Sequence, residues 1–313
     1  MQLSQKRRWM NMQKFLNNYL FVEKRKFAYL LSMILIIAGI GVGIVRGFHM
    51  GIDFTGGTMI QLNMGAVVDG GELETFIGKQ GIKVNVTNAG DEGESVIIKT
   101  TLAMDNTSRM ELIDAIRQEY QIQMEDEVFI ENSTYIGPSI GDLLKKNAVK
   151  ALAFAAVGML IYIIIRFEWM SAMTAILALC HDVLMMIAFY GLFHVQINSP
   201  FIAAILTVVG YSINNTIVIY DRVRENKRLM KKSRLNDLIN TSIRQTLSRT
   251  IMTSLTTAAA IVPLYVLGGS VIREFLLPLL VGVIGGTYSS IFIAAPLYYD
   301  LYHLIHKPKY RGK

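Results

Sequence analysis

Cysteine and charge are both scarce in this chain. Cys180 is the single cysteine among 313 residues, so no disulfide can form within the chain and cysteine usage does not report a redox compartment. Charged residues make up only 18% of the sequence, against about 25% in an ordinary soluble protein. This balance excludes disordered, collagen-like and disulfide-rich secreted proteins. A soluble globule so poor in charge would expose apolar patches, so the composition predicts a membrane protein with a water-exposed part.

Catalytic signatures are also lacking. The sequence contains no GxSxG and no HExxH motif, and Gly78-Lys79 is not preceded by the glycine spacing of a phosphate-binding loop. We therefore predict that the chain is not an enzyme and uses no cofactor. His181 lies between Cys180 and Asp182, but successive helical residues point about 100° apart, so we predict no metal site there.

Six apolar stretches are long enough to cross a membrane as helices, which takes about 20 residues each. They cover about residues 27–45, 148–165, 170–192, 200–220, 251–267 and 275–298. The first run is too long, and its basic lead too extended, for a cleaved signal peptide. The predicted organisation is a first transmembrane helix at 27–46, an external domain at 47–146, and helices two to six within 147–298. The fold class is thus an α-helical polytopic membrane protein with an external α+β domain.

Basic residues predict the orientation of these helices. With the amino terminus inside, 20 of the 31 lysines and arginines lie on the inner side. All of them except Arg166 fall in the amino-terminal segment 1–26, in a loop at about 221–248 and in the tail 299–313. We therefore predict that both termini are cytoplasmic. Topology and contact with anionic lipid headgroups explain the basic charge, so no nucleic-acid partner is predicted.

The segment between the first two spans is acidic, with a net charge of −9 over residues 47–147. Its pattern predicts strands at 58–63, 84–88, 95–101 and 128–136, with helices at 71–80 and 108–120. Thr107 or Ser108 is the expected cap of the second helix. The order β-α-β-β-α-β predicts a ferredoxin-like domain. We expect this domain to contact a partner or substrate.

Three stretches carry specific motifs. Residues 51–58 read GIDFTGGT, in which Gly51, Asp53, Gly56 and Gly57 suit a tight turn from helix to strand, with Asp53 as a local cap. Residues 210–226 read GYSINNTIVIYDRVREN, and residues 245–250 read QTLSRT.

The second and third motifs place polar residues on two neighbouring spans. One helical face carries Thr207, Gly210, Tyr211, Asn214 and Asp221, and the other carries Arg249, Thr253, Thr256 and Thr257. We predict that the two faces form a shared polar seam. Asn214 and Asn215 are costly in a membrane unless they are hydrogen-bonded, so they either clamp helices together or serve the transport path.

Asp182 is the only acid within the predicted spans, which makes it a candidate functional group with His181 beside it. The alternative is a structural carboxylate that stays neutral or pairs with Arg249. Arg249 itself either has a functional role or extends to the cytoplasmic headgroups. Glycine stripes at 39–43 and 282–286 predict close helix packing.

Together these motifs resemble the SecD/SecF family of protein-export membrane subunits over nearly the whole chain. The resemblance rests on GIDFTGGT, Pro138-Ser139-Ile140-Gly141, His181-Asp182, GYSIN followed by DRVREN (with Asp221 and Arg222), and QTLSRT. It implies a SecD-type six-span partner, a place beside the SecYEG channel in the bacterial cytoplasmic membrane, and exported polypeptide as substrate. It also implies that an ion gradient, of protons or sodium, drives the assembly. Arg249 matches a family arginine that is associated with ion transport, so the resemblance implies that role for it.

One position departs from the family pattern. The family commonly has an aspartate where this chain has Asn215, and an amide cannot take up a proton near neutral pH. This departure leaves three alternatives: the partner supplies the titrating carboxylate, Asp182 or His181 substitutes for it, or this subunit is mainly structural. The alternative function is half of a small-molecule or lipid exporter of the related resistance-nodulation-division superfamily.

Overall fold

The computed structural model describes residues 20–90, 93–230 and 233–306. Most of the predicted amino-terminal basic segment, the tail from residue 307, and two lysines of the basic loop, Lys231 and Lys232, lie outside these ranges.

Six long helical segments in the described chain are apolar enough to cross a membrane, as the sequence predicts. They are α2 (Arg25–Arg46), α7 (Pro138–Arg166), α8 (Trp169–Phe193), α9 (Ser199–Leu229), α10 (Leu235–Leu267), and a last segment formed by α11 (Ser270–Ser289), a π-helix (Ser290–Ala294) and α12 (Ala295–Ile305). The short helix α3 (Ile52–Thr55) follows α2.

Two of these helices begin well before their apolar runs. The chain enters α7 at Pro138 rather than near 148, and α10 begins at Leu235 rather than near 251. Hydropathy marks only the stretch that lipid can surround, whereas a helix continues wherever its backbone stays hydrogen-bonded. The extra turns carry charged residues such as Asp142 and Lys145, which lie at the surface.

The segment between α2 and α7 contains a four-stranded antiparallel sheet of order β2-β3-β1-β4. The strands are β1 (Gly57–Asn63), β2 (Asn85–Ala89), β3 (Ser95–Thr100) and β4 (Ile130–Ile136). The helices α4 (Gly70–Lys79), α5 (Asn106–Glu119) and α6 (Asp126–Phe129) complete it. One apolar core joins sheet and helices and includes Ile60, Leu73, Ile98, Ile116 and Phe129.

Two local predictions in this segment are wrong. Asp105, not Thr107 or Ser108, caps α5, since its Oδ1 accepts a hydrogen bond from the backbone N of Ser108 over 2.8 Å. The last strand begins at Ile130 instead of 128, because residues 126–129 close a single helical turn that buries Phe129. An alternating pattern does not distinguish that turn from the strand that follows it.

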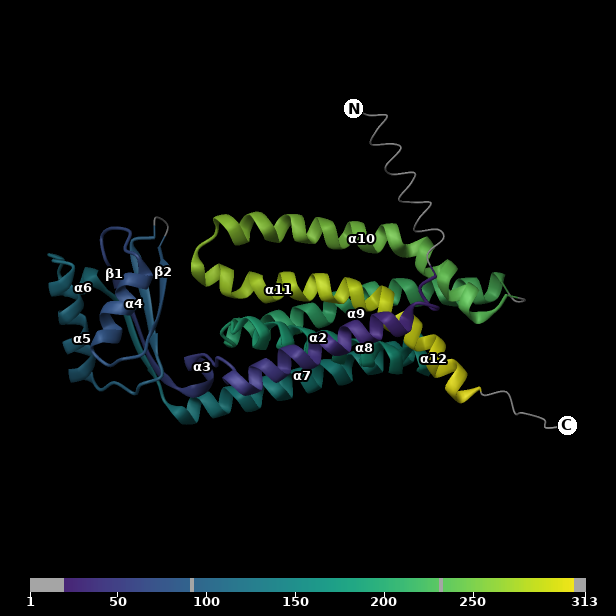
Figure 1. The fold of residues 1–313 in the computed structure, drawn as a ribbon, viewed down its shortest axis with the longest axis horizontal. Coiled ribbons are helices and arrows are strands. Elements are labelled where there is room, and N and C mark those ends of the chain that lie inside the picture. The colour runs from purple at the N-terminus through teal and green to yellow at the C-terminus, as the bar shows by residue number, and fades with distance from the viewer. Residues whose placement is uncertain (1–19, 91–92, 231–232, 307–313) are drawn as a thin grey trace, which may run out of the picture.

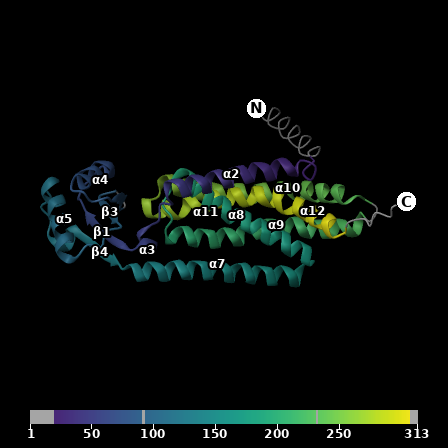
Figure 2. The same cartoon turned by 60° about the horizontal axis from the view of Figure 1, so that its bottom comes forward.

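The sheet lies at one end of the long helices, and α12 and the α9–α10 connection lie at the other (Figure 1). The core of the bundle is built on α8 and α9, where Tyr190 packs on Phe201 with ring centroids 4.3 Å apart. Helix α7 runs along the outside of the bundle (Figure 2) and is its least buried span.

Glycines allow the closest helix contacts, as predicted. A Cβ on Gly39 of α2 would lie 2.3 Å from the backbone O of Ala188 in α8, and a Cβ on Gly282 of α11 would lie 2.2 Å from a methyl carbon of Val208 in α9. These helices approach closely because no side chain separates them.

Candidate functional site

A buried carboxylate lies in the middle of α8. Asp182 is only 2% exposed. Its Oδ2 accepts a hydrogen bond from Ser212 Oγ of α9 over 2.5 Å, and its Oδ1 lies 3.1 Å from His181 Nδ1. The alternative in which Asp182 pairs with Arg249 is therefore wrong. The hydrogen-bond partners of this carboxylate are thus a hydroxyl and an imidazole, neither of which carries a permanent positive charge.

Further buried polar groups connect to Ser212 on α9 and on the last span. Thr216 Oγ1 lies 3.0 Å from Ser290 Oγ, and Ser290 also contacts the backbone O of Ser212. Ser290 begins the π-helical turn of the last span, and such turns are frequent at functional sites. We call Asp182, His181, Ser212, Asn215, Thr216 and Ser290 the intramembrane polar cluster.

Two members of the intramembrane polar cluster have free hydrogen-bonding capacity. Asn215 is 2% exposed, and its Nδ2 has no hydrogen-bond partner among the residues that the structure describes. The same holds for Nε2 of His181 within those ranges. An unpaired buried amide is costly, so this position does not behave as a fully satisfied helix clamp. Asn214 is exposed and lies outside the cluster.

The predicted seam between α9 and α10 forms only in part. Tyr211 donates to Ser254 over 3.1 Å, and Ser254 lies 2.5 Å from Thr287 of α11. The other predicted residues stay at least partly exposed: Thr207, Gly210, Asn214, Asp221, Arg249, Thr253, Thr256 and Thr257. Periodicity finds a polar face correctly, but it does not tell which neighbour covers that face. The buried polar contacts of α9 involve other residues, which are Ser212, Thr216, Tyr220 and Asn226. Asn226 donates to Ser242 of α10 over 2.9 Å.

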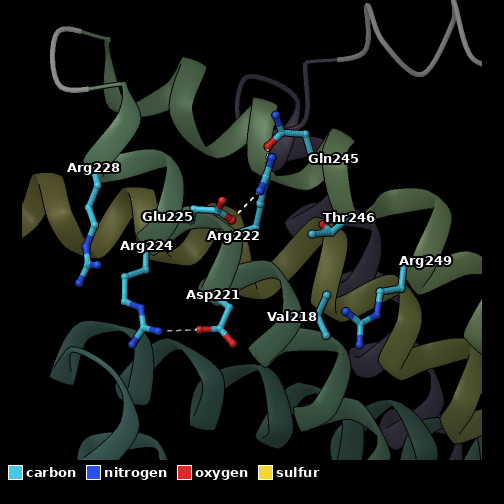
Figure 3. A pocket seen from close by; sticks show the side chains of 9 residues that line it. All are labelled: Val218, Asp221, Arg222, Arg224, Glu225, Arg228, Gln245, Thr246 and Arg249. Atoms are coloured by element: carbon cyan, nitrogen blue, oxygen red, sulfur yellow. Dashed lines mark hydrogen bonds and ion pairs between the residues drawn. The ribbon is translucent and has the colours of Figure 1, made fainter.

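A polar cavity of about 670 Å³ opens beside the basic end of α9 and α10 (Figure 3). Its lining is Val218, Asp221, Arg222, Arg224, Glu225, Arg228, Gln245, Thr246 and Arg249. Asp221 pairs with Arg224 at 3.1 Å, and Arg222 donates to Gln245 over 2.6 Å. These contacts tie the DRVREN and QTLSRT motifs together. Arg249 has no ion-pair partner within the described ranges, and its side chain lies beside Val218 in Figure 3.

The GIDFTGGT motif joins the helices to the sheet. Asp53 Oδ2 accepts a hydrogen bond from the backbone N of Ser199 over 2.7 Å, so it caps α9 across the fold instead of its own turn. Gly51 N donates to the backbone O of Ile197 over 2.7 Å. Gly56 and Gly57 have positive φ values of 76° and 148°, and a Cβ on Gly57 would lie 2.1 Å from the backbone O of Thr100.

The helix that follows the sheet closes on the same motif. A Cβ on Gly141 of α7 would lie 2.7 Å from the backbone O of Phe54, so the PSIG motif packs directly against GIDFTGGT. Glu274 adds a contact that sequence reasoning missed. It accepts from Lys99 of β3 and from Asn198 over 2.9 and 2.6 Å. Glu274 belongs to α11 but lies just before the sixth apolar run, so the hydropathy pattern leaves it outside the predicted span.

Two protein families match the sequence. Residues 117–304 match the family described as "Protein export membrane protein SecD/SecF, C-terminal", and residues 42–64 match the "SecD/SecF GG Motif". The chain belongs to the SecD/SecF family. The family identified from the motifs is thereby confirmed, and the chain is a multi-pass membrane protein.

Relatives named "Protein translocase subunit SecF" match along almost their full length. The protein from Sebaldella termitidis is 37% identical over 92% of this chain and 93% of its own. The protein from Calditerrivibrio nitroreducens is 39% identical over 90% of this chain and 94% of its own. The chain is thus similar to these SecF subunits over about nine tenths of its length.

A solved structure supports the arrangement of the helices. The crystal structure of SecDF, described as a translocon-associated membrane protein from Thermus thermophilus, superimposes with a TM-score of 0.77 at 35% identity. The match covers 91% of this chain but only 39% of that one. A SecDF structure described as a super-membrane-facing form superimposes with a TM-score of 0.68 over 92% of this chain. The chain therefore spans about two fifths of SecDF.

Proposed function

We propose that the chain is an accessory membrane subunit of the Sec protein-export machinery, without catalytic activity of its own. It pairs with a SecD-type partner beside the SecYEG channel and assists the ion-gradient-driven translocation of unfolded polypeptides. The observation that carries this proposal is the match to SecF subunits over about nine tenths of both chains. Because the chain spans 39% of the solved SecDF protein, the partner would supply the remaining spans.

The proposed location is the bacterial cytoplasmic membrane, with both termini inside and the sheet on the outer face. Arginines and lysines support this orientation. Arg224 donates to the Arg166 backbone, and Lys227 pairs with Glu168. These residues belong to the carboxyl-terminal ends of α7 and α9 and to the α7–α8 connection, at the end of the bundle opposite to the sheet (Figure 1). The domain boundaries at 27–46, 47–146 and 147–298 follow from the same assignment.

We assign the external segment to the ferredoxin-like fold. Its strands and main helices follow the order β-α-β-β-α-β, and the antiparallel sheet has the strand order β2-β3-β1-β4. A domain of this kind, carrying most of the chain's acids, would meet the partner or the emerging polypeptide.

Ion coupling in this subunit is assigned to Asp182, with His181 as its neighbour. Asp182 is buried in the middle of α8, and its hydrogen-bond partners among the described residues are a hydroxyl and an imidazole, which favours an ion-handling role over a structural pair. Asn215 cannot titrate, so a second carboxylate would come from the partner. Asn214 and Arg249 lie on exposed faces of α9 and α10, where a partner span could reach them.

Native co-purification tests the proposed function. Recovery of a six-span relative together with the export channel supports it, as does accumulation of unprocessed precursors when the chain is depleted. Self-association alone, with drug or lipid phenotypes and normal secretion, supports the half-exporter alternative instead.

A further inference from the structure

Two loops meet at the joint between the sheet and the membrane helices. Residues 47–51 lead from α2 into the GIDFTGGT motif, and residues 194–198 connect α8 to α9. Ile197 N donates to the backbone O of His49 over 2.8 Å, and Gly51 N donates to the backbone O of Ile197 over 2.7 Å. These two hydrogen bonds hold the loops in register as a short parallel bridge. We call this bridge the outer joint.

A pair of histidines lies across the outer joint. The rings of His49 and His194 stack with centroids 5.3 Å apart and an angle of 13° between their planes. His194 ends α8 in the left-handed conformation, with φ of 53°, which turns the loop back toward residue 49. His194 is exposed and His49 is half-buried, so protons from water reach the pair.

The surroundings of the pair contain few charges that could offset a second proton. Both rings line a cavity of about 370 Å³ with Glu74 of α4, Lys83 of the α4–β2 loop and Lys99 of β3. Lys99 is paired with Glu274 of α11 at 2.9 Å. That leaves Glu74 to attract a proton and Lys83 to repel it. Burial, followed by the proximity of His194, lowers the pKa of His49 below its ordinary value of 6.5.

We propose that His49 and His194 form an acid-sensing site whose double protonation loosens the outer joint between the sheet and the membrane helices. Two stacked imidazolium rings repel each other, whereas two neutral rings stack favourably. The site goes beyond the proposed function, and it relies on that proposal only in placing the joint on the outer, proton-rich face.

The direction of the pH dependence follows from linkage. An opened joint returns His49 to water, where its pKa is higher, so the open form binds protons more tightly than the closed form. The closed joint is therefore most stable above about pH 6.5 and weakens as the pH falls toward the lower pKa of the closed form.

Amide hydrogen exchange of the purified full chain in detergent tests the site directly. The reporters are the backbone amides of Gly51 and Ile197, which form the two hydrogen bonds of the joint. Rates are expressed as protection factors, which removes the intrinsic effect of pH on exchange, and amides of α5 serve as an internal reference. We expect protection at the joint to fall about tenfold between pH 7.5 and 5.0 while α5 stays unchanged.

Substitutions at one position separate charge from packing. Asn tolerates the left-handed backbone of residue 194, so His194→Asn should fold and should lose the acid response. His194→Lys places a permanent charge beside His49 and should show weak protection already at pH 7.5. His49→Gln is the second variant that removes the pair. His306→Gln, at the opposite end of the chain's fold, is the control and should respond as the unsubstituted protein does.

The outcomes are distinct from those of the export test. An equal acid response in His194→Asn and in the unsubstituted protein overturns the site, and so does constant protection at the joint across this pH range. Neither result depends on a partner or on export. The export test can therefore contradict the proposed function while the acid-sensing site is confirmed, and hydrogen exchange can contradict the site while the proposed function is confirmed.

Discussion

Ser212 of α9 donates a hydrogen bond of 2.5 Å to the carboxylate of Asp182 in α8. Both residues are buried, at 1% and 2% exposure, within spans that the apolar core holds together. Burying a carboxylate within a span costs free energy, so such a residue is a candidate for function. The hydroxyl of Ser212 can rotate to donate to or accept from its partner. This contact makes Asp182 the first position to test for ion coupling.

Asp182→Asn should impair export more than Asn215→Ala. The amide keeps the size of the side chain and can still accept from Ser212, but it cannot carry a proton. We expect several-fold accumulation of an unprocessed secretory precursor in Asp182→Asn cells and a smaller effect in Asn215→Ala cells, measured by pulse-chase labelling. Ser212→Ala, which keeps the carboxylate, is the matched control and should fall between them. Normal export in both of the first two variants would exclude ion coupling through this subunit.

Gly57→Ala should destabilise the fold strongly. The new Cβ would lie 2.1 Å from the Thr100 backbone O, at a φ of 148° that side chains rarely adopt. We expect the free energy of unfolding to fall by about 3 kcal/mol, because of backbone strain at residue 57 together with displacement of β3. Gly81→Ala is the control, since Gly81 also has a positive φ but an open surrounding, and it should cost only about 1 kcal/mol. Thermal unfolding in detergent measures both, and equal losses would contradict the close contact with Thr100.

Glu274→Gln should weaken the attachment of the sheet to α11. The substitution removes the charge that pairs with Lys99 over 2.9 Å, where the two side chains are 16% and 22% exposed. We expect the free energy of unfolding to fall by about 1 kcal/mol, and we expect faster proteolytic cleavage between the sheet and the helices. Asp142→Asn removes an exposed pair with Lys145 and should change stability by less than about 0.5 kcal/mol. Similar proteolysis of the two variants would argue against a role for Glu274 at this contact.

Glu168→Gln should make the stability of the fold depend less on pH in the acid range. The hydrogen bond from Lys227 lowers the pKa of Glu168 below its ordinary value of 4.5, although partial burial opposes the shift. A lowered pKa means that this carboxylate stabilises the fold above about pH 4.5 and that the contribution is lost as the pH falls further. Unfolding midpoints between about pH 6 and 3 measure the slope. Tyr298→Phe is the control: it removes a neutral partner of Glu168 at 3.2 Å and should retain most of the pH dependence. An unchanged pH dependence in Glu168→Gln would show that Glu168 does not contribute to acid stability.

The spans were the most predictable part of the molecule. Lipid requires a long apolar run, and such a run is visible without knowledge of any neighbour. The helix ends were less predictable: α10 begins sixteen residues before its apolar run, and the true cap of α5, Asp105, lies two residues before the first predicted one. The start of α5 depends on one capping hydrogen bond, and α10 continues as a helix beyond its apolar run; the hydropathy pattern records neither.

The site was predictable by residue type but not by arrangement. Asp182 and His181 stand out as ionisable groups in an apolar run, yet nothing in the pattern indicates Ser212 as the partner. Asp53 looks like a local cap and instead caps α9, 146 positions away in the chain. Arg249 and Asp182 carry opposite charges, yet Arg249 is exposed and Asp182 is buried. Each of these contacts joins helices whose relative rotation is set only by packing.

Apolar run lengths, basic clusters and short glycine-rich motifs were enough to establish a six-span membrane chain of the SecD/SecF family, because each is a property of neighbouring residues. Folding in three dimensions decided which side of every helix is covered, that Ser212 meets Asp182, and that His49 stacks on His194. Those pairings depend on how closely α2, α8, α9 and α11 can approach one another, and that distance is the outcome of many side chains packing at once.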